Sequence, residues 1–247
     1  MTLIEVDPNI SPPWAGVRSH HVAQLTLSAQ AVPAKLQRSV YSSLLDRLLY
    51  RHPFEGNSAR RYSRLERPAF GDLDDRLLDQ MGLDGAQRLL DLGCGPGTFA
   101  RVAAARHPKL GVIAIDPSRD MVCNKAVPGT LRARGEALPL ADGSIDVAIL
   151  LSSIRHVRDR AQTLRELRRV VRDRVWIIEL DPDADRTRIA THAERIGSPL
   201  MRRAFGPFVV RTAPPATQIL ALAAEAGFAR RTVRPDPVQP VYIMELA

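Results

Sequence analysis

Residues 89–98 read LLDLGCGPGT, an apolar run that ends in an aspartate and is followed by Gly93, Gly95 and Gly97. Glycine adopts positive φ angles and lets the backbone approach another backbone or a ligand closely. In an open α/β sheet, the turn that follows the first strand is the usual place for a ligand. Three kinds of ligand fit such a turn: a phosphate group, a dinucleotide, or a smaller adenosyl compound.

Apolar runs and helical patterns alternate on either side of this turn. The predicted strands are 88–92, 111–116, 144–151 and 174–180, the helices between them are 98–107, 118–126 and 160–171, and a helix at 216–228 and strands at 230–235 and 240–246 follow. Buried strands that alternate with helices indicate a mostly parallel sheet that helices cover on both faces, with right-handed crossovers. We therefore predict an α/β fold.

The pattern divides the chain into four parts. These are an N-terminal arm and helical cap at 1–70, a core at 71–181, an inserted cap segment at 182–215, and a C-terminal part of the core at 216–247. Apolar residues at helical spacing predict helices over 33–50 and 71–81. The segment 182–215 is rich in proline and breaks the alternation. We expect substrate choice to depend on this segment, on the helix 33–50 and on the segment 51–70. The aromatic residues of these parts, Phe54, Tyr62, Phe70, Phe205 and Phe208, fit a small-molecule pocket and ordinary packing equally.

The formal net charge of +8 comes mostly from arginines spread along the chain, since the lysines are Lys35, Lys109 and Lys125 alone. This spread is not typical of a nucleic-acid patch, so no nucleic-acid partner is predicted. The basic run at 165–174 has apolar residues at helical spacing, which favours a solvated helix face. The sequence does not indicate an oligomeric state.

Several features limit the cellular setting. The chain has no uninterrupted apolar run of about 18 residues, so no membrane span is predicted. Its first residues carry acids and lack an apolar segment, whereas a secretory signal has a basic start and an apolar segment. We therefore expect a cytoplasmic location. The two cysteines, Cys94 and Cys123, form neither a disulfide framework nor a metal-binding pattern.

The residues around the glycine turn discriminate between the three ligands. A phosphate loop of the Walker type needs a lysine, and none is near. The dinucleotide fingerprint places its third glycine one position later, where this chain has Thr98. Asp91 would repel a pyrophosphate but would attract a cationic ammonium or sulfonium group. Asp116, which ends the next strand, can accept hydrogen bonds from a ribose diol. S-adenosylmethionine has both groups.

This ordered set resembles the class I S-adenosylmethionine-dependent methyltransferases of the small-molecule type. DLGCGPG at 91–97 is similar to the first motif of the family, IDPS at 115–118 to the second, and 135–157 to the stretch that holds the adenine edge, the fourth strand and the following loop. The resemblance implies a doubly wound, mostly parallel seven-stranded Rossmann-like sheet. The cofactor-binding residues that it implies are Asp91, Gly93, Cys94, Gly95, Gly97, Asp116, Pro117, Met121, Glu136, Ala137, Leu150 and Leu151.

The chain departs from the family pattern at one important place. Many relatives have Asp-Ala before E-x-L-P, and this aspartate accepts the adenine amino group, whereas this chain has Arg134 and Gly135. An arginine has no acceptor atom. Either Glu136 or a backbone carbonyl then takes this role, or the adenine is held more loosely.

The resemblance implies methyl transfer by in-line displacement, for which positioning supplies much of the rate and no metal is needed. His156 follows the fourth predicted strand and is the candidate general base, although it also fits a plain turn residue. Glu179 and Asp181 end the strand at 174–180, where a site role and a solvated strand end fit equally. His20 and His21 lie in the N-terminal arm.

We expect a small-molecule acceptor, with the methylated atom (O, N or C) left open. Two other functions are kept as alternatives. One is a nicotinamide-dependent oxidoreductase on a related sheet, and the other is a protein of the same fold that binds the cofactor without turnover.

Overall fold

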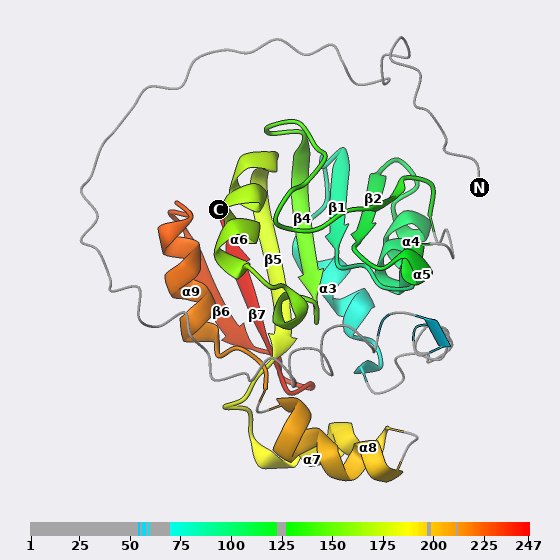
Figure 1. Ribbon diagram of the computed structural model, residues 1–247, viewed down its shortest axis with the longest axis vertical. Coiled ribbons are helices and arrows are strands. Elements are labelled where there is room, and N and C mark those ends of the chain that lie inside the picture. The colour runs from blue at the N-terminus through cyan, green and yellow to red at the C-terminus, as the bar shows by residue number, and fades with distance from the viewer. Residues whose placement is uncertain are drawn as a thin grey trace. The chain divides into compact units, whose positions relative to one another are not determined.

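The computed structural model describes residues 54, 56–57, 59, 70–122, 127–196, 199–210 and 212–247. Its centre is a seven-stranded sheet in the order β3-β2-β1-β4-β5-β7-β6 (Figure 1). The strands are β1 (Arg88–Leu92), β2 (Gly111–Asp116), β3 (Thr130–Arg132), β4 (Ile145–Leu151), β5 (Val171–Leu180), β6 (Arg231–Pro235) and β7 (Val241–Leu246). The first five are parallel, and β7 is antiparallel to both β5 and β6. This confirms the predicted fold class.

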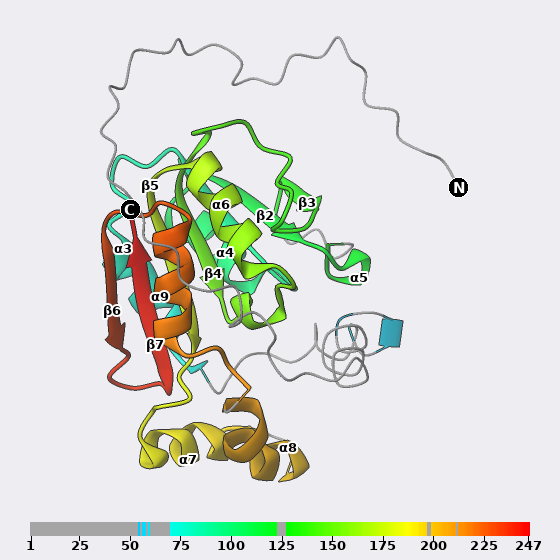
Figure 2. The ribbon, with the colours of Figure 1, turned by 60° about the vertical axis from the view of Figure 1, so that its left-hand side comes forward.

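Helices cover both faces of the sheet (Figures 1 and 2). The helices of the described part of the chain are α3 (Leu73–Met81), α4 (Thr98–Arg106), α5 (Arg119–Val122), α6 (Arg160–Val170), α7 (Arg186–Glu194), α8 (Pro199–Ala204) and α9 (Ala216–Glu225), with a 3-10 turn η3 at Ile154–His156 and a π-helical turn η4 at Phe205–Val210. Of these, α7 and α8 lie beyond the end of the sheet and cover neither face (Figures 1 and 2). The apolar residues of α3 and α4 belong to one core cluster, and those of α6 and α9 belong to the other.

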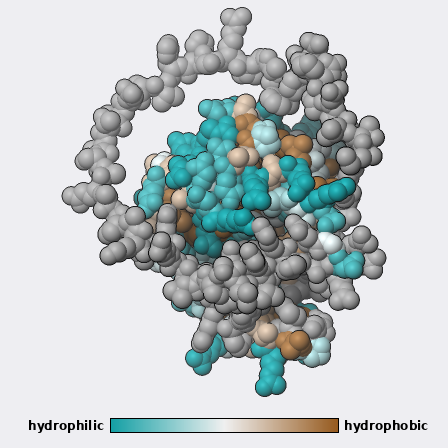
Figure 3. Space-filling view, viewed as in Figure 1, coloured by the Kyte–Doolittle hydropathy of each residue, from teal (hydrophilic) through white to brown (hydrophobic). Residues whose placement is uncertain are grey.

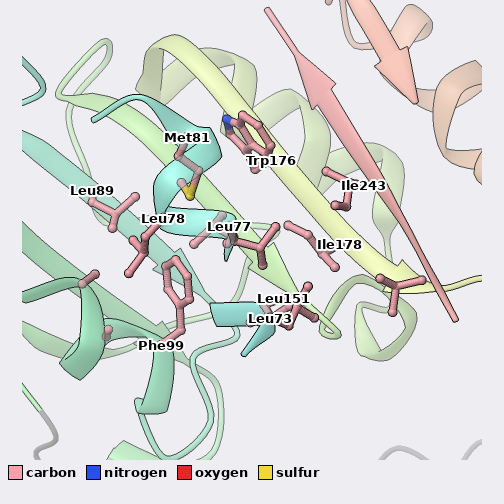
Figure 4. Packing of buried hydrophobic residues seen from close by; sticks show 14 of the residues in the cluster. Leu73, Leu77, Leu78, Met81, Leu89, Phe99, Leu151, Trp176, Ile178 and Ile243 are labelled. Carbon is pink, nitrogen blue, oxygen red and sulfur yellow. The ribbon is translucent and has the colours of Figure 1, made fainter. Parts of the chain in front are cut away.

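Strand alternation assigns neighbouring residues to these two clusters. In β1, Leu89 packs in the cluster with α3 and α4, while Leu90 packs in the cluster with α6 and α9. Both are fully buried, because successive side chains of a strand point to opposite faces and here both faces are covered. Figure 4 shows Leu73, Leu77 and Met81 of α3 lying against the sheet residues. The central strands therefore carry apolar residues on both faces, and their buried charged residues, Asp91 and Glu179, lie near the carboxyl ends of β1 and β5.

The prediction missed the edge strand β3 and the 3-10 turn η3. Only Arg119–Val122 of the expected helix at 118–126 is described as helix, and residues 123–126 lie outside the described part. The predicted helix at 33–50, His20, His21 and Cys123 also lie outside it. The expected strand at 174–180 begins earlier, at Val171, directly after α6.

The segment between β5 and α9 folds as α7, α8 and η4. His192 of α7 is buried, its Nδ1 lies 2.8 Å from Oε1 of Gln239, and its ring stacks on Phe205 and meets the edge of Phe70. Burial lowers the pKa of His192 below its ordinary value. Arg188 also donates to the carbonyl of Asp236, so α7 is joined to the turn between β6 and β7.

The basic run on α6 has the predicted orientation. Leu167, Val170 and Val171 are buried, while Arg165 and Arg168 are exposed. Figure 3 shows hydrophilic residues over the region where α6 lies in Figure 1. Among the described residues, no helix has both the length and the apolar character that a membrane crossing requires.

Candidate functional site

A cavity of about 710 Å³ opens where β1, β2 and β4 end. Parallel strands bring their carboxyl ends to one edge of the sheet, which explains why loops distant in sequence meet there. The lining residues are Phe54, Asp91, Leu92, Gly93, Cys94, Gly95, Pro96, Thr98, Phe99, Asp116, Pro117, Ser118, Arg132, Ala133, Arg134, Gly135, Glu136, Leu151, Ser152, Ser153, His156, Val157 and Arg158.

The glycine turn forms one wall of the cavity. Gly93, Gly95 and Gly97 all have positive φ angles, of 75°, 53° and 73°. The amides of Gly93 and Cys94 both donate to the carbonyl of Ile115, at 2.7 and 3.1 Å, which holds the turn against the end of β2. A β-carbon at Gly93 would lie 2.4 Å from Cβ of Ser153, so the turn and the loop after β4 touch at this point.

Gly93→Ala should therefore destabilise the protein by about 3 kcal/mol, because backbone strain at positive φ adds to overpacking. In a Ser153→Gly background the same substitution should cost at least about 1 kcal/mol less, since the overpacking is relieved. Denaturant unfolding of the four proteins in this double-mutant cycle measures both values. Equal costs in the two backgrounds would contradict the contact between these positions.

Asp116 connects the glycine turn to the end of β2. Its Oδ2 accepts from the amide of Gly95 at 2.9 Å, and its Oδ1 accepts from the amide of Ser118 at 2.8 Å. Burial raises the pKa of Asp116, and the two amides act in the opposite direction. A carboxylate oxygen has more than one acceptor position, so Asp116 can bind a hydroxyl as well as these amides.

Asp91 lies in the same wall, at the carboxyl-terminal part of β1, and is only 2% exposed. It gives the cavity a second buried carboxyl group. Burial, and then the charges of Asp91 and Asp116, raise the pKa of the Cys94 thiol. Cys94 is consequently a neutral thiol at physiological pH, which makes it a weak nucleophile.

The loop after β4 forms the facing part of the lining. Ser152 has a φ angle of 53°, in the left-handed region that few residues other than glycine adopt. Ser153 then donates from Oγ to the carbonyl of Leu92 at 2.8 Å. His156 follows in η3, and its ring meets the edge of Phe54 with 4.9 Å between the ring centroids. Both rings line the cavity.

Burial, and then the charges of Arg155 and Arg160, lower the pKa of His156 to about 3. Its imidazole is neutral throughout the physiological range. A base with so low a pKa removes protons weakly, because general bases work best with a pKa near the working pH. This environment favours a hydrogen-bonding role for neutral His156.

A third part of the wall comes from the connection between β3 and β4. Glu136 Oε1 accepts from the amide of Asp159 at 3.2 Å, which ties this connection to the start of α6. A β-carbon at Gly135 would lie 2.8 Å from Cγ2 of Thr163, so this site has no room for the alanine of the family pattern. The side chain of Arg134 borders the cavity and makes no hydrogen bond or ion pair with a described residue.

Most of the predicted cofactor residues come together in this cavity. Asp91, Gly93, Cys94, Gly95, Asp116, Pro117, Glu136 and Leu151 line it, as does the predicted base His156. Gly97, Met121, Ala137 and Leu150 are not among the lining residues. Leu150 is fully buried in the cluster with α6 and α9, because it points to the opposite face of β4 from Leu151.

The structure adds lining residues that were not among the predicted site residues, among them Ser152, Ser153 and Arg158, and Phe54 of the segment 51–70 also lines the cavity. The signals for this loop were the resemblance of 135–157 to the family stretch and the paired serines directly after the predicted strand. In the part of the chain that the structure describes, no group of His, Cys, Asp and Glu side chains has the arrangement of a metal site.

Comparisons with known proteins agree with this geometry. Residues 90–178 match the protein family described as "Methyltransferase domain". The chain is 36% identical to an uncharacterized 37.1 kDa protein in a transposon of Streptomyces fradiae, over 64% of this chain and 48% of that protein. It is 35% identical to the ubiquinone/menaquinone biosynthesis C-methyltransferase UbiE of Syntrophotalea carbinolica, over 49% of this chain and 56% of that protein. The chain thus spans about half the length of these curated relatives.

Solved structures show the same fold. A SAM-dependent methyltransferase from Aquifex aeolicus superposes with a TM-score of 0.58 at 18% identity, over 78% of this chain and 97% of that one. The plantazolicin methyltransferase BpumL in complex with SAH superposes with a TM-score of 0.62 at 11% identity, over 82% and 95% of the two chains. At these identities the similarity concerns the fold alone.

Proposed function

We propose that this chain, whose core belongs to the class I S-adenosylmethionine-dependent methyltransferases, transfers the methyl group of that cofactor to a small-molecule acceptor. The observation that carries the proposal is the pair of buried carboxyl groups, Asp91 and Asp116, at the ends of adjacent strands and in the wall of one cavity. Such a pair suits a ligand with a positive group and a ribose, and it opposes a diphosphate.

Each part of the cavity has a proposed role. The glycine turn and Asp91 would hold the methionyl end with its sulfonium, and Asp116 would accept from the ribose hydroxyls. Glu136 borders the cavity, and its carboxylate would accept from the adenine amino group in place of the aspartate of the family pattern. Met121, Ala137, Gly97 and Leu150 would then act indirectly, by supporting the loops that line the cavity.

The bound cofactor supplies an activated methyl group. The protein's part is to align the acceptor with that group and to exclude water, which can provide much of the rate of a displacement. Phe54 and Val157 contribute apolar surface to the cavity. Neutral His156 would orient the acceptor by a hydrogen bond, and an acceptor that is already nucleophilic would need no stronger base.

A small-molecule acceptor is consistent with the named relatives. One is a ubiquinone/menaquinone biosynthesis C-methyltransferase, and another, from Pseudescherichia vulneris, is a malonyl-[acyl-carrier protein] O-methyltransferase, 36% identical over 40% of this chain. The first name specifies methylation of carbon and the second methylation of oxygen. The nicotinamide-dependent alternative has less support, because Asp91 would face the pyrophosphate.

The test has two stages. Calorimetric titration with S-adenosylhomocysteine should show saturable binding, and incubation of a cell extract with the protein and methyl-labelled S-adenosylmethionine should give a labelled small product, identified by mass spectrometry. Absence of binding at millimolar ligand would contradict the proposal. Tight binding with no labelled product from a broad panel of acceptors would favour the non-catalytic alternative.

A further inference from the structure

A buried ion pair lies directly behind the loop that follows β4. Glu179, near the end of β5, is completely buried. Its Oε1 accepts from Nε of Arg155 at 2.9 Å and from its neighbouring amide at Leu180, at 2.8 Å. Its Oε2 accepts from the backbone amide of Arg155 at 3.2 Å. One carboxylate therefore holds both the side chain and the main chain of the residue before His156.

Burying this ion pair costs desolvation free energy, so a gain in stability does not by itself explain why the pair is present. Both charges lose water on folding, and replacing a buried ion pair with apolar residues is often neutral or even stabilising. A buried pair with several hydrogen bonds does, however, fix one local geometry. This favours a role for Glu179 and Arg155 in defining the conformation of the loop.

The loop that they fix carries two groups of the cavity wall. Ser152 donates its amide to the carbonyl of Ile178, next to Glu179, at 2.7 Å, and then turns through its left-handed φ angle. Its Oγ is buried and has no hydrogen-bond partner among the described residues. His156 lies at the other end of the loop, and its amide donates to the carbonyl of Ser153 at 3.0 Å.

We propose that Glu179 is a positioning residue, which acts through Arg155 to hold residues 152–156 so that Ser152 and His156 face the ligand. The role in ligand binding rests on the proposed function, whereas the ordering of the loop does not. Glu179 does not line the cavity, and its effect reaches the ligand only through the loop.

The test uses Glu179→Gln, together with the double variant Arg155→Met/Glu179→Gln, which removes both charges of this pair and so leaves neither partner buried without the other. The matched control is Asp236→Asn, since Asp236 is also fully buried and paired with an arginine, Arg76, but lies outside the cavity. Amide hydrogen exchange is measured on each full-length protein without ligand, and S-adenosylhomocysteine affinity is measured by calorimetry.

Both Glu179 variants should exchange at least tenfold faster over residues 152–156, with the rest of the core unchanged, and should bind S-adenosylhomocysteine at least fivefold more weakly. The control should leave the exchange of 152–156 and the affinity within twofold of the parent protein. Unchanged exchange in the loop, faster exchange spread over the whole chain, or a faster loop with unchanged affinity would each overturn the proposal. If the parent protein itself binds no S-adenosylhomocysteine, the proposed function fails, while the exchange data still decide whether Glu179 orders the loop.

Discussion

Asp116→Ala should weaken the binding of S-adenosylhomocysteine by about 100-fold, as expected for the loss of charge-assisted hydrogen bonds to a ribose. The substitution also removes the acceptor for the amides of Gly95 and Ser118, so part of the loss will come from a looser glycine turn. Calorimetric titration measures the affinity, and thermal unfolding measures how much stability is lost.

Asp146→Ala separates these two contributions. Asp146 also accepts from two backbone amides, those of Gln87 and Arg88, at 2.8 and 2.9 Å, but it lies at the start of β4 and does not border the cavity. Asp146→Ala should lower the free energy of unfolding and leave the affinity for S-adenosylhomocysteine within about twofold of the parent value. Hydrogen bonds that lie outside the binding site stabilise the fold but do not contact the ligand. Equal loss of affinity in both variants would argue against a ribose contact at Asp116.

His156→Gln should lower kcat by about 100-fold, because the shorter reach of the amide would leave the acceptor out of line and a misplacement of about 1 Å can have this cost. The loss should be the same from pH 5.5 to 8.5. The pKa of His156 is lowered to about 3, so the imidazole is neutral above that pH and gains no proton as the pH falls through this range. A bound sulfonium cation would lower this pKa further.

The measurement is the pH dependence of kcat for the parent protein and the variant, with the acceptor found in the labelling screen. His107→Gln is the control, since His107 ends α4 and does not line the cavity. A loss of parental activity with a midpoint near pH 6.5, absent from His156→Gln, would contradict a neutral histidine and restore the general base that the sequence suggested.

Local patterns explain which parts of the fold were predictable. The strands at 88–92 and 111–116 are near-continuous apolar runs between clear turn signals, and the structure has them at the predicted residues. The strand at 130–132 has two exposed residues of three and lies at the sheet edge, so its sequence has no apolar pattern to detect. Its conformation comes from pairing with β2.

The site residues likewise divide into those that local motifs predict and those that only the fold brings together. Asp91, Gly93, Gly95 and Asp116 lie in short motifs, so their meeting in one cavity followed from the topology of a parallel sheet. The sequence indicated Phe54 only as one of several aromatic residues that fit a pocket or ordinary packing, and its contact with His156 is a tertiary one. Ser152 reaches the cavity through an unusual backbone angle, which a linear pattern does not record. The same is true of Glu179, whose hydrogen bonds to Arg155 identify it as a buried partner and not a solvated strand end.

The packing of Ser153 into the space left by Gly93 has a consequence for how such a protein diversifies. A bulkier residue at one of these two positions requires the other to stay small, so the strand-one turn and the loop after β4 form a linked pair under selection. Sequence changes can therefore accumulate more freely in α7 and α8, which belong to neither loop and contribute no residue to the cavity wall, than at position 153.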